Sequence, residues 1–291
     1  MIMSAIQLCS TPDVEQNLSV IDQQLSILCS EPLSAAVHGN EHIVVLPECC
    51  LYFGGQAQGQ LALARKKEHS KYLINRLGAL AKKYQVILVA GTIPLINAAG
   101  TKCTNSSCLF TKEGEFIAQY DKIHLFDVNV DDNEKSYLES ADTEAGDRLV
   151  VANIHPQPMI NIGLSICYDL RFPELYRSLT VSGATIITVP SAYTKVTGKA
   201  HWQALLQARA IENQVYIIAA GQVGQHENGR ETWGHSLIIS PWGEILSQIK
   251  NAVGSISAIY QPEEIERIRS TMPVQEHNQF TIELNKHEPN E

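Results

Sequence analysis

Long hydrophobic runs are missing from this chain: no apolar stretch in its 291 residues approaches the roughly 18 residues that a membrane-crossing helix needs. Charged residues make up only 18% of the chain, against 44% hydrophobic residues, which is typical of a globular protein. The net charge of −9 is spread out and forms no basic stripe, the feature that marks nucleic-acid binders. We therefore expect a globular protein with no membrane span and no nucleic-acid partner.

Cysteine is sparse and scattered, which argues against a disulfide framework. The chain has an odd number of cysteines, at Cys9, Cys29, Cys49, Cys50, Cys103, Cys108 and Cys167. Cys103 and Cys108 are too widely spaced for a zinc knuckle and have no matching second pair. We expect reduced thiols, most of them packed as small core residues, and no metal site.

A targeting leader is not evident at the start of the sequence. Residues 1–8 run directly into a strand-like alternation, with no basic leader, long apolar core or small-residue cleavage site. On this basis we expect the protein to be cytoplasmic.

Buried strands alternate with helices along the chain, which predicts an α/β fold. Apolar residues recur at helical spacing from Val14 to Leu28, after an Asp13 that is suited to cap the helix. Further helices are expected over 73–84, after Pro173, over 202–211 and over 261–269, and strands over 43–46, 86–91, 106–110, 116–120, 160–166, 185–189, 215–221, 236–240 and 244–248. The polar stretch 121–147 is expected to be a long loop.

Two segments of the first half are similar to two segments of the second half. The strand at 43–47 resembles that at 186–190, and the strand at 86–91 resembles that at 216–221. Each pair encloses a helix, so two similar halves packed sheet against sheet would form a layered sandwich of helix, sheet, sheet and helix. We expect one domain over residues 1–275, followed by a polar tail over 276–291.

Cys167 is the strongest candidate for a catalytic residue. It lies where a buried strand turns towards a helix that begins near Pro173, a position that exposes an attacking thiol. The backbone N–H of Tyr168 is the natural donor to a developing oxyanion. A buried cysteine is more often structural, so position alone does not establish this role.

The companions of Cys167 strengthen the hypothesis. Glu48 and Lys122 each follow a hydrophobic strand, and strand ends at one edge of a sheet are where α/β folds build their sites. A carboxylate can accept the thiol proton, and an ammonium can stabilise an oxyanion. Each residue alone has an ordinary explanation: Glu48 as a turn cap, Lys122 as a solvated lysine.

Three separated motifs together resemble those of the nitrilase, or carbon-nitrogen hydrolase, superfamily. They are Leu46-Pro-Glu48, Asp121-Lys-Ile-His-Leu-Phe-Asp127 and Cys167-Tyr-Asp-Leu-Arg-Phe-Pro-Glu174. The resemblance spans about residues 4–277. It implies a four-layer αββα sandwich, a catalytic triad of Glu48, Lys122 and Cys167, and a second supporting glutamate at Glu139.

The resemblance extends to one branch of the superfamily. The segments 190–202, 209–212 and 233–236 are similar to those of ω-amidases and deaminated glutathione amidases. This implies hydrolysis of a small carboxamide, one that carries a carboxylate, to an acid and ammonia through a cysteine thioester, without a metal or organic cofactor. Relatives associate through the helices near the nucleophile, so a homodimer or higher homo-oligomer is also implied.

Other residues are expected to support the site. Tyr193 and Thr194 follow a strand end and are expected to line the substrate pocket. Arg171 and Glu174 are interpreted as an ion pair that fixes the turn around the nucleophile.

Rival functions remain open. An N-carbamoyl amine amidohydrolase would use the same triad and also release carbon dioxide. A non-catalytic binding protein, or a thiol redox sensor that uses Cys49 and Cys50, would need no triad. A Cys-His protease would draw on one of ten histidines; His124, His201 and His235 are candidates, but nothing in the sequence singles one out.

Overall fold

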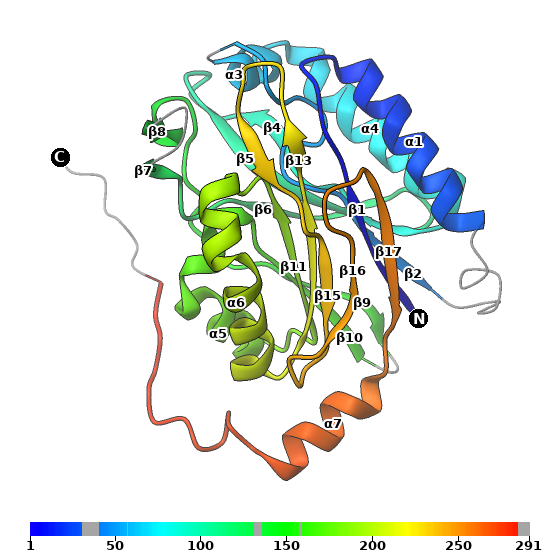
Figure 1. Cartoon of the computed structure of the whole chain (residues 1–291), viewed down its shortest axis with the longest axis vertical. Coiled ribbons are helices and arrows are strands. Elements are labelled where there is room, and N and C mark those ends of the chain that lie inside the picture. Colours follow the sequence, from blue (N-terminus) through cyan, green and yellow to red (C-terminus); the bar gives the residue numbers. More distant parts are fainter. Residues whose placement is uncertain (31–40, 57, 131–135, 157–158, 285–291) are drawn as a thin grey trace.

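Two β-sheets form the centre of the molecule, and helices cover the outer face of each sheet (Figure 1). The structure is a computed structural model that describes residues 1–30, 41–56, 58–130, 136–156 and 159–284. It has the predicted order of layers: helices, sheet, sheet, helices.

The first sheet contains seven strands in the order β17-β1-β2-β3-β5-β4, with β6 paired to β5. Strands β1, β2 and β3 are parallel, whereas β5 is antiparallel to β3, β4 and β6. Because β6 reverses the direction of β5, it points the same way as β2. The bounds are β1 Ile2–Gln7, β2 His42–Val45, β3 Ile87–Val89, β4 Ile93–Ile96, β5 Cys103–Phe110, β6 Phe116–Asp121 and β17 Gly254–Ile259.

The second sheet contains six strands in the order β16-β15-β12-β11-β10-β9. Its middle strands β10, β11 and β12 are parallel, and β9 and β15 flank them in the antiparallel sense. The bounds are β9 Val151–Pro156, β10 Met159–Leu164, β11 Ile186–Ser191, β12 Tyr216–Gly221, β15 Leu237–Ile239 and β16 Ile245–Gln248. The parallel triplets of the two sheets account for the internal similarity seen in the sequence, since β2 matches β11 and β3 matches β12.

Helices α1 and α4 pack on the first sheet, and α5 and α6 pack on the second (Figure 1). The helix bounds are α1 Val14–Ser30, α3 Gly59–Ala64, α4 Lys67–Tyr84, α5 Pro173–Val181, α6 Lys195–Asn213 and α7 Pro262–Thr271. The predicted cap of α1 is confirmed, because Asp13 Oδ1 accepts hydrogen bonds from Glu15 N at 2.9 Å and from Gln16 N at 3.0 Å. Thr194 caps α6 in the same manner by accepting from Thr197 N.

The parallel strands of the first sheet are apolar on both faces because each face meets a different core. In β2, Ile43 and Val45 pack between the sheets, whereas Val44 packs beneath α1 and α4. Side chains alternate between the faces of a strand, so a strand buried on both faces gives a continuous apolar run. This is why the sequence shows β2 as an uninterrupted hydrophobic segment.

Backbone and side-chain hydrogen bonds join the two sheets where their parallel strands end. Leu8 N donates to Gly221 O at 3.4 Å, and Val223 N donates to Leu8 O at 2.8 Å. The fully buried Gln222 side chain donates to Ser10 Oγ at 2.8 Å and to Glu48 O at 3.0 Å. These bonds fix the carboxyl ends of the two sheets against each other.

Several elements were not predicted. Strands β4, β9 and β17 and helix α3 lie in segments that show no clear hydrophobic period. The expected loop over 121–147 contains a short ribbon and a 3-10 turn, with residues 131–135 outside the described residues; its elements are β7 Asp127–Asn129, β8 Ser136–Leu138 and η1 Glu139–Ala141. Helix α6 begins at Lys195, seven positions before the expected start at Trp202, because Thr194 supplies a cap that the periodicity did not indicate.

The chain beyond α7 forms no further helix or strand up to residue 284. A turn in which Glu276 N donates to Pro273 O at 3.1 Å crosses the expected boundary at 275, and residues 285–291 lie outside the described residues. The domain boundary stays a prediction. No helix in the described part of the chain has the length and hydropathy needed to span a membrane.

Two buried histidines should make the fold sensitive to acid. Burial lowers the pKa of His42 and of His226 from 6.5 to about 4. Both rings stay neutral in the folded state while the unfolded chain takes up protons, so their stabilisation is complete above pH 6.5 and is lost as pH falls towards 4. For each histidine we expect the free energy of unfolding to fall by on the order of 2 kcal/mol between pH 7 and pH 5.

Urea unfolding at the two pH values measures this loss. The His42→Gln variant should show a smaller difference between pH 5 and pH 7 than the parent protein. An unchanged difference in the variant would contradict the assignment to His42.

Candidate active site

A cavity of about 470 Å³ lies at the carboxyl ends of the parallel strands, and both sheets contribute to its wall. Glu48 follows β2 and Lys122 follows β6, both in the first sheet. Cys167 follows β10 and Tyr193 follows β11, both in the second sheet. The three residues that the sequence singled out, Glu48, Lys122 and Cys167, therefore line one cavity.

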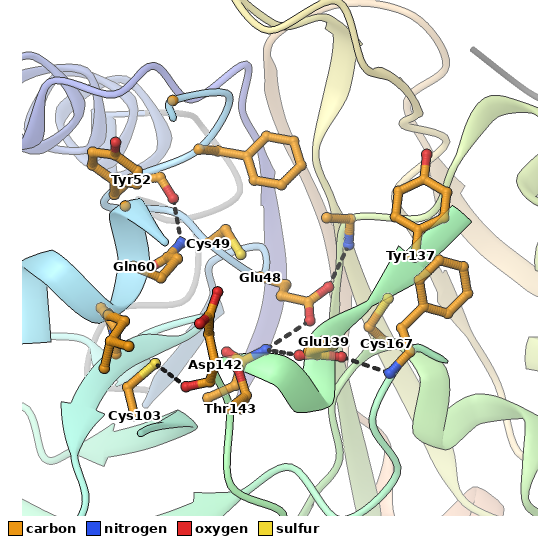
Figure 2. A pocket seen from close by; sticks show the side chains of 18 of the residues that line it. Glu48, Cys49, Tyr52, Gln60, Cys103, Tyr137, Glu139, Asp142, Thr143 and Cys167 are labelled. Carbon is orange, nitrogen blue, oxygen red and sulfur yellow. Dashed lines mark hydrogen bonds between the residues drawn. The ribbon is translucent and has the colours of Figure 1, made fainter. Parts of the chain in front are cut away.

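Lys122 is held between Glu48 and Glu139, two glutamates of the cavity wall that are labelled in Figure 2. Lys122 Nζ donates to Glu48 Oε1 at 2.9 Å and to Glu139 Oε2 and Oε1 at 2.9 and 3.2 Å. Lys122 is only 2% exposed and Glu48 only 4%. A buried ammonium needs carboxylate partners of this kind, because taking a charge out of water costs several kcal/mol (order of magnitude).

The two glutamates are held in turn by further donors. Asn105 Nδ2 donates to Glu48 Oε1 at 2.9 Å and to Glu139 Oε1 at 3.1 Å. Ala192 N donates to Glu48 Oε2 at 2.9 Å, and Phe126 N donates to Glu139 Oε2 at 2.7 Å. Both carboxylates therefore have fixed positions before any substrate enters.

The protonation states of the group follow from burial and charge. Burial alone would raise the pKa of Glu48, but the Lys122 ammonium and the hydrogen bonds from Cys167, Lys122 and Asn105 lower it overall. Burial alone would lower the pKa of Lys122, but Glu139 and Glu48 raise it well above its usual value. At neutral pH Glu48 is therefore a carboxylate and Lys122 an ammonium.

Cys167 lies at the start of η2 (Cys167–Arg171) with a backbone φ of +49°, which is unusual for a residue with a side chain. Its thiol lines the same cavity as the Glu48 carboxylate, and each group shifts the pKa of the other. Burial and then the charge of Glu48 raise the pKa of this thiol well above its usual value, so the resting form is the neutral thiol. A thiol in this state can attack only if its proton leaves as the new bond forms, and Glu48 is in place to accept it.

Asp169 joins the turn that carries Cys167 to the segment that carries Lys122. Its fully buried carboxylate accepts from Ile166 N at 2.9 Å and from Tyr120 Oη at 2.7 Å. The other oxygen of Asp169 accepts from His124 N at 3.1 Å and pairs with His124 Nδ1 at 2.7 Å. Because Tyr120 and His124 lie on either side of Lys122, this carboxylate sets the spacing between Lys122 and Cys167.

A family model described as carbon-nitrogen hydrolase matches residues 3–269. The chain belongs to the carbon-nitrogen hydrolase family. This protein is therefore an enzyme that acts on amides, as the motifs around Glu48, Lys122 and Cys167 predicted.

Similar proteins cover almost the whole of this carbon-nitrogen hydrolase. A deaminated glutathione amidase from Yersinia enterocolitica is 39% identical over 283 residues, which are 97% of this chain and 94% of the relative. The omega-amidase NIT3 of Saccharomyces cerevisiae is 33% identical over 249 residues and covers 84% of each chain. The predicted relationship to this branch of the nitrilase superfamily is confirmed.

Solved structures agree with the fold. The crystal structure of Saccharomyces cerevisiae Nit3, a member of branch 10 of the nitrilase superfamily, matches with a TM-score of 0.82 at 29% identity over 96% of this chain and 97% of that one. The Caenorhabditis elegans NitFhit protein matches with a TM-score of 0.84 at 30% identity over 99% of this chain and 68% of that one. The predicted four-layer αββα sandwich is confirmed.

Tyr193 and Thr194, the expected substrate contacts, differ in whether their hydroxyl groups already have hydrogen-bond partners in the protein. The Tyr193 hydroxyl is buried in the cavity wall and has no hydrogen-bond partner among the described residues, so it is available to a ligand. Thr194 also lines the cavity, but its hydroxyl already caps α6. Tyr168 borders the cavity next to Cys167, and its ring packs edge-on against Phe126 at 5.1 Å.

The predicted ion pair between Arg171 and Glu174 is wrong, because these two described side chains form no salt bridge with each other. The Arg171 guanidinium lies 5.7 Å from the ring centre of Tyr168 and 5.5 Å from that of Tyr193. Glu174 is exposed in the first turn of α5, where the helix dipole favours a negative charge. Spacing along the sequence could not show that Arg171 turns towards the aromatic rings.

The sequence reasoning also missed residues that hold the site. Asn105 lies inside β5, and a polar residue within a buried strand could have drawn attention to it. The Ala192 amide leaves no signal in the sequence, because any residue type can supply a backbone N–H. Asp169 belongs to the motif that identified the family, but its role depends on contacts with a distant segment.

The structure gives little support to a redox sensor that uses Cys49 and Cys50, or to a Cys-His protease. Burial raises the pKa of Cys50 to about 12 and that of Cys49 well above its usual value, which disfavours the thiolates that a redox sensor needs. His124 is engaged by Asp169, His201 contacts Arg171, and His235 stacks on Trp233 with a centroid distance of 4.0 Å. Within the described ranges, no three His, Cys, Asp or Glu side chains are grouped so that they could hold a metal ion.

The Asp169→Asn variant tests the link between the two sheets. An amide at this position keeps one acceptor oxygen but presents a donor to groups that already donate, so we expect the turn at Cys167 to shift. A misplacement of about 1 Å can lower kcat by around 100-fold. Steady-state kinetics measures the effect, and circular dichroism checks the fold.

Tyr120→Phe is the matched control for Asp169→Asn. It removes a single donor to Asp169 and leaves the other three in place, so its loss of kcat should be much smaller. A folded Asp169→Asn protein with the parent kcat would contradict the positioning role.

Proposed function

We propose that this enzyme hydrolyses the amide bond of a small carboxylate-bearing molecule through a thioester on Cys167. The observation that carries the proposal is that one cavity brings together the Cys167 thiol, the Glu48 carboxylate and the buried Lys122, which donates to Glu48 at 2.9 Å. Relatives named deaminated glutathione amidase and omega-amidase support a linear amide as the substrate.

In the first half of the reaction Cys167 attacks the amide carbonyl. Glu48 takes the thiol proton as the S–C bond forms, and the negative charge moves to the carbonyl oxygen. The Tyr168 amide and the positive charge of Lys122 stabilise that oxygen. Glu48 then delivers the proton to the leaving nitrogen as the C–N bond breaks, which releases ammonia, or an amine where the amide nitrogen is substituted.

In the second half a water molecule replaces the departed nitrogen group. Glu48 takes a proton from this water, which adds to the thioester carbonyl, and collapse of the adduct returns the proton to the sulfur of Cys167. The products are a carboxylic acid and the free enzyme. Glu139 keeps Lys122 oriented in both halves, since it accepts two of the three hydrogen bonds of that amine.

We also propose that the protein forms a homo-oligomer and lies in the cytoplasm. Exposed apolar side chains on α5, on α6 and in the turn between β15 and β16 support a homo-oligomer of at least two copies; they include Val181, Ile211 and Trp242 at 69%, 53% and 57% exposure. All seven cysteines are free, which supports the reducing cytoplasm. Light scattering on the purified protein tests the first point.

Removing the thiol and removing the base should lower turnover to different extents. Cys167→Ala should abolish turnover, and Glu48→Gln should lower kcat by about 100- to 10,000-fold, the usual contribution of a general base. Cys29→Ala, which removes a thiol on α1 outside the cavity, is the control and should keep the parent rate. Product analysis by mass spectrometry follows acid, nitrogen product and any carbon dioxide.

The thioester itself is measurable. Rapid acid quenching followed by intact-protein mass spectrometry should reveal the acyl group on Cys167 in the parent protein and nothing on Cys167→Ala. Appreciable amide hydrolysis by pure Cys167→Ala protein would sink the mechanism. Release of carbon dioxide together with ammonia would instead identify an N-carbamoyl substrate.

A further inference from the structure

Arg230 is a cation in the cavity wall whose side chain has no acidic partner in the described part of the chain. It lies in the hairpin between β13 (Val223–Gln225) and β14 (Glu231–Trp233) and is half-buried. Its guanidinium carbon lies 4.8 Å from the ring centre of Phe53 and also 4.8 Å from that of Tyr137. The guanidinium lies over both rings in cation–π contacts, and none of its N–H groups meets a carboxylate among the described residues.

The acidic side chains that line the cavity, among the residues the structure describes, already have partners. Glu48 and Glu139 bind Lys122, and Asp142 Oδ1 accepts from Gln58 Nε2 at 3.0 Å. Just outside, Glu231 pairs with Lys195 at 3.0 Å. Because a buried arginine normally has an anionic partner, the charge of Arg230, unmatched among the described residues, points to an anion that this part of the chain does not supply.

The reacting end of the cavity is unsuited to a second anion. Its two carboxylates and one ammonium have a net charge of −1, so a substrate carboxylate placed next to Cys167 would be repelled. Arg230 lies at the opposite end of a row of aromatic rings. Its neighbour Tyr137 packs on Phe126 with a centroid distance of 5.1 Å, and Phe126 packs on Tyr168, which is adjacent to Cys167 in the chain.

We propose that Arg230 binds the carboxylate of the substrate and thereby selects amides whose acid group is remote from the bond that is cut. This inference rests on the proposed function and adds a specificity-determining residue to it. The planar guanidinium matches a carboxylate through two parallel N–H···O bonds, and its position between Phe53 and Tyr137 is set before the ligand arrives. The aromatic row between the two ends then contacts the apolar part of the substrate.

The test compares matched pairs of amides that differ only in charge. Succinamate, glutaramate, α-ketoglutaramate and deaminated glutathione are each assayed with the corresponding methyl ester, in which the carboxylate is masked. The parent protein should prefer the acid of its best pair by at least 10-fold in kcat/KM. In Arg230→Met, KM for the acid should rise about 10- to 100-fold with little change in kcat, whereas KM for the ester should stay the same, because a charged hydrogen bond made equally in ground and transition states affects binding alone.

Two further variants separate charge from structure. Arg230→Lys keeps the charge but loses the planar fork, so its KM for the acid should lie between those of the parent and Arg230→Met. Arg267→Met removes a positive charge from α7, where Arg267 pairs with Glu264, and should behave like the parent. Raised salt should weaken binding of the acid to the parent protein and not to Arg230→Met.

The outcomes distinguish this inference from the proposed function. If the parent protein hydrolyses acid and ester equally well, or if Arg230→Met impairs both to the same extent, Arg230 does not read the carboxylate although the enzyme remains an amidase. If no amide of either charge reacts and no acyl group forms on Cys167, the proposed function fails, and the role of Arg230 fails with it.

Discussion

The buried ion group of Lys122, Glu48 and Glu139 is the interaction on which the site depends. Each carboxylate would be costly to bury alone, and so would the ammonium, but together they satisfy one another with the help of Asn105 and two backbone amides. The group keeps Glu48 ionised beside a neutral thiol. A base that is ready to accept a proton is therefore a consequence of the same charges that make the site stable.

This ion group can form only where the two sheets meet. Lys122 and Glu48 come from the first sheet, whereas Cys167 and the Ala192 amide come from the second. Gln222 and Asp169 tie the sheets together on either side of the group, through the Glu48 carbonyl and through Tyr120 and His124. The carboxyl ends of parallel strands from two sheets thus converge on a single cavity, as α/β folds commonly arrange their sites.

Charge is distributed unevenly within that cavity. The net negative charge lies at the reacting end, and the unmatched positive charge of Arg230 lies beyond the aromatic rings. A neutral amide with a distant carboxylate is complementary to this pattern. The sequence could not have revealed it, because Phe53 follows β2, Tyr137 lies in β8 and Arg230 lies in the hairpin between β13 and β14, and only the fold brings these distant segments together.

The sequence by itself determined the layered α/β fold and the catalytic candidates. Strands buried on both faces have a continuous apolar pattern, and the candidate catalytic residues Glu48 and Cys167 follow such strands. Tertiary structure alone decided the partners of individual side chains. Asn105 and Ala192 bind Glu48, aromatic rings contact Arg171 in place of Glu174, and Phe53 and Tyr137 contact Arg230. The reason is physical, since periodicity along the chain records which face of an element is buried, whereas a hydrogen bond or an ion pair depends on the positions of two distant segments in space.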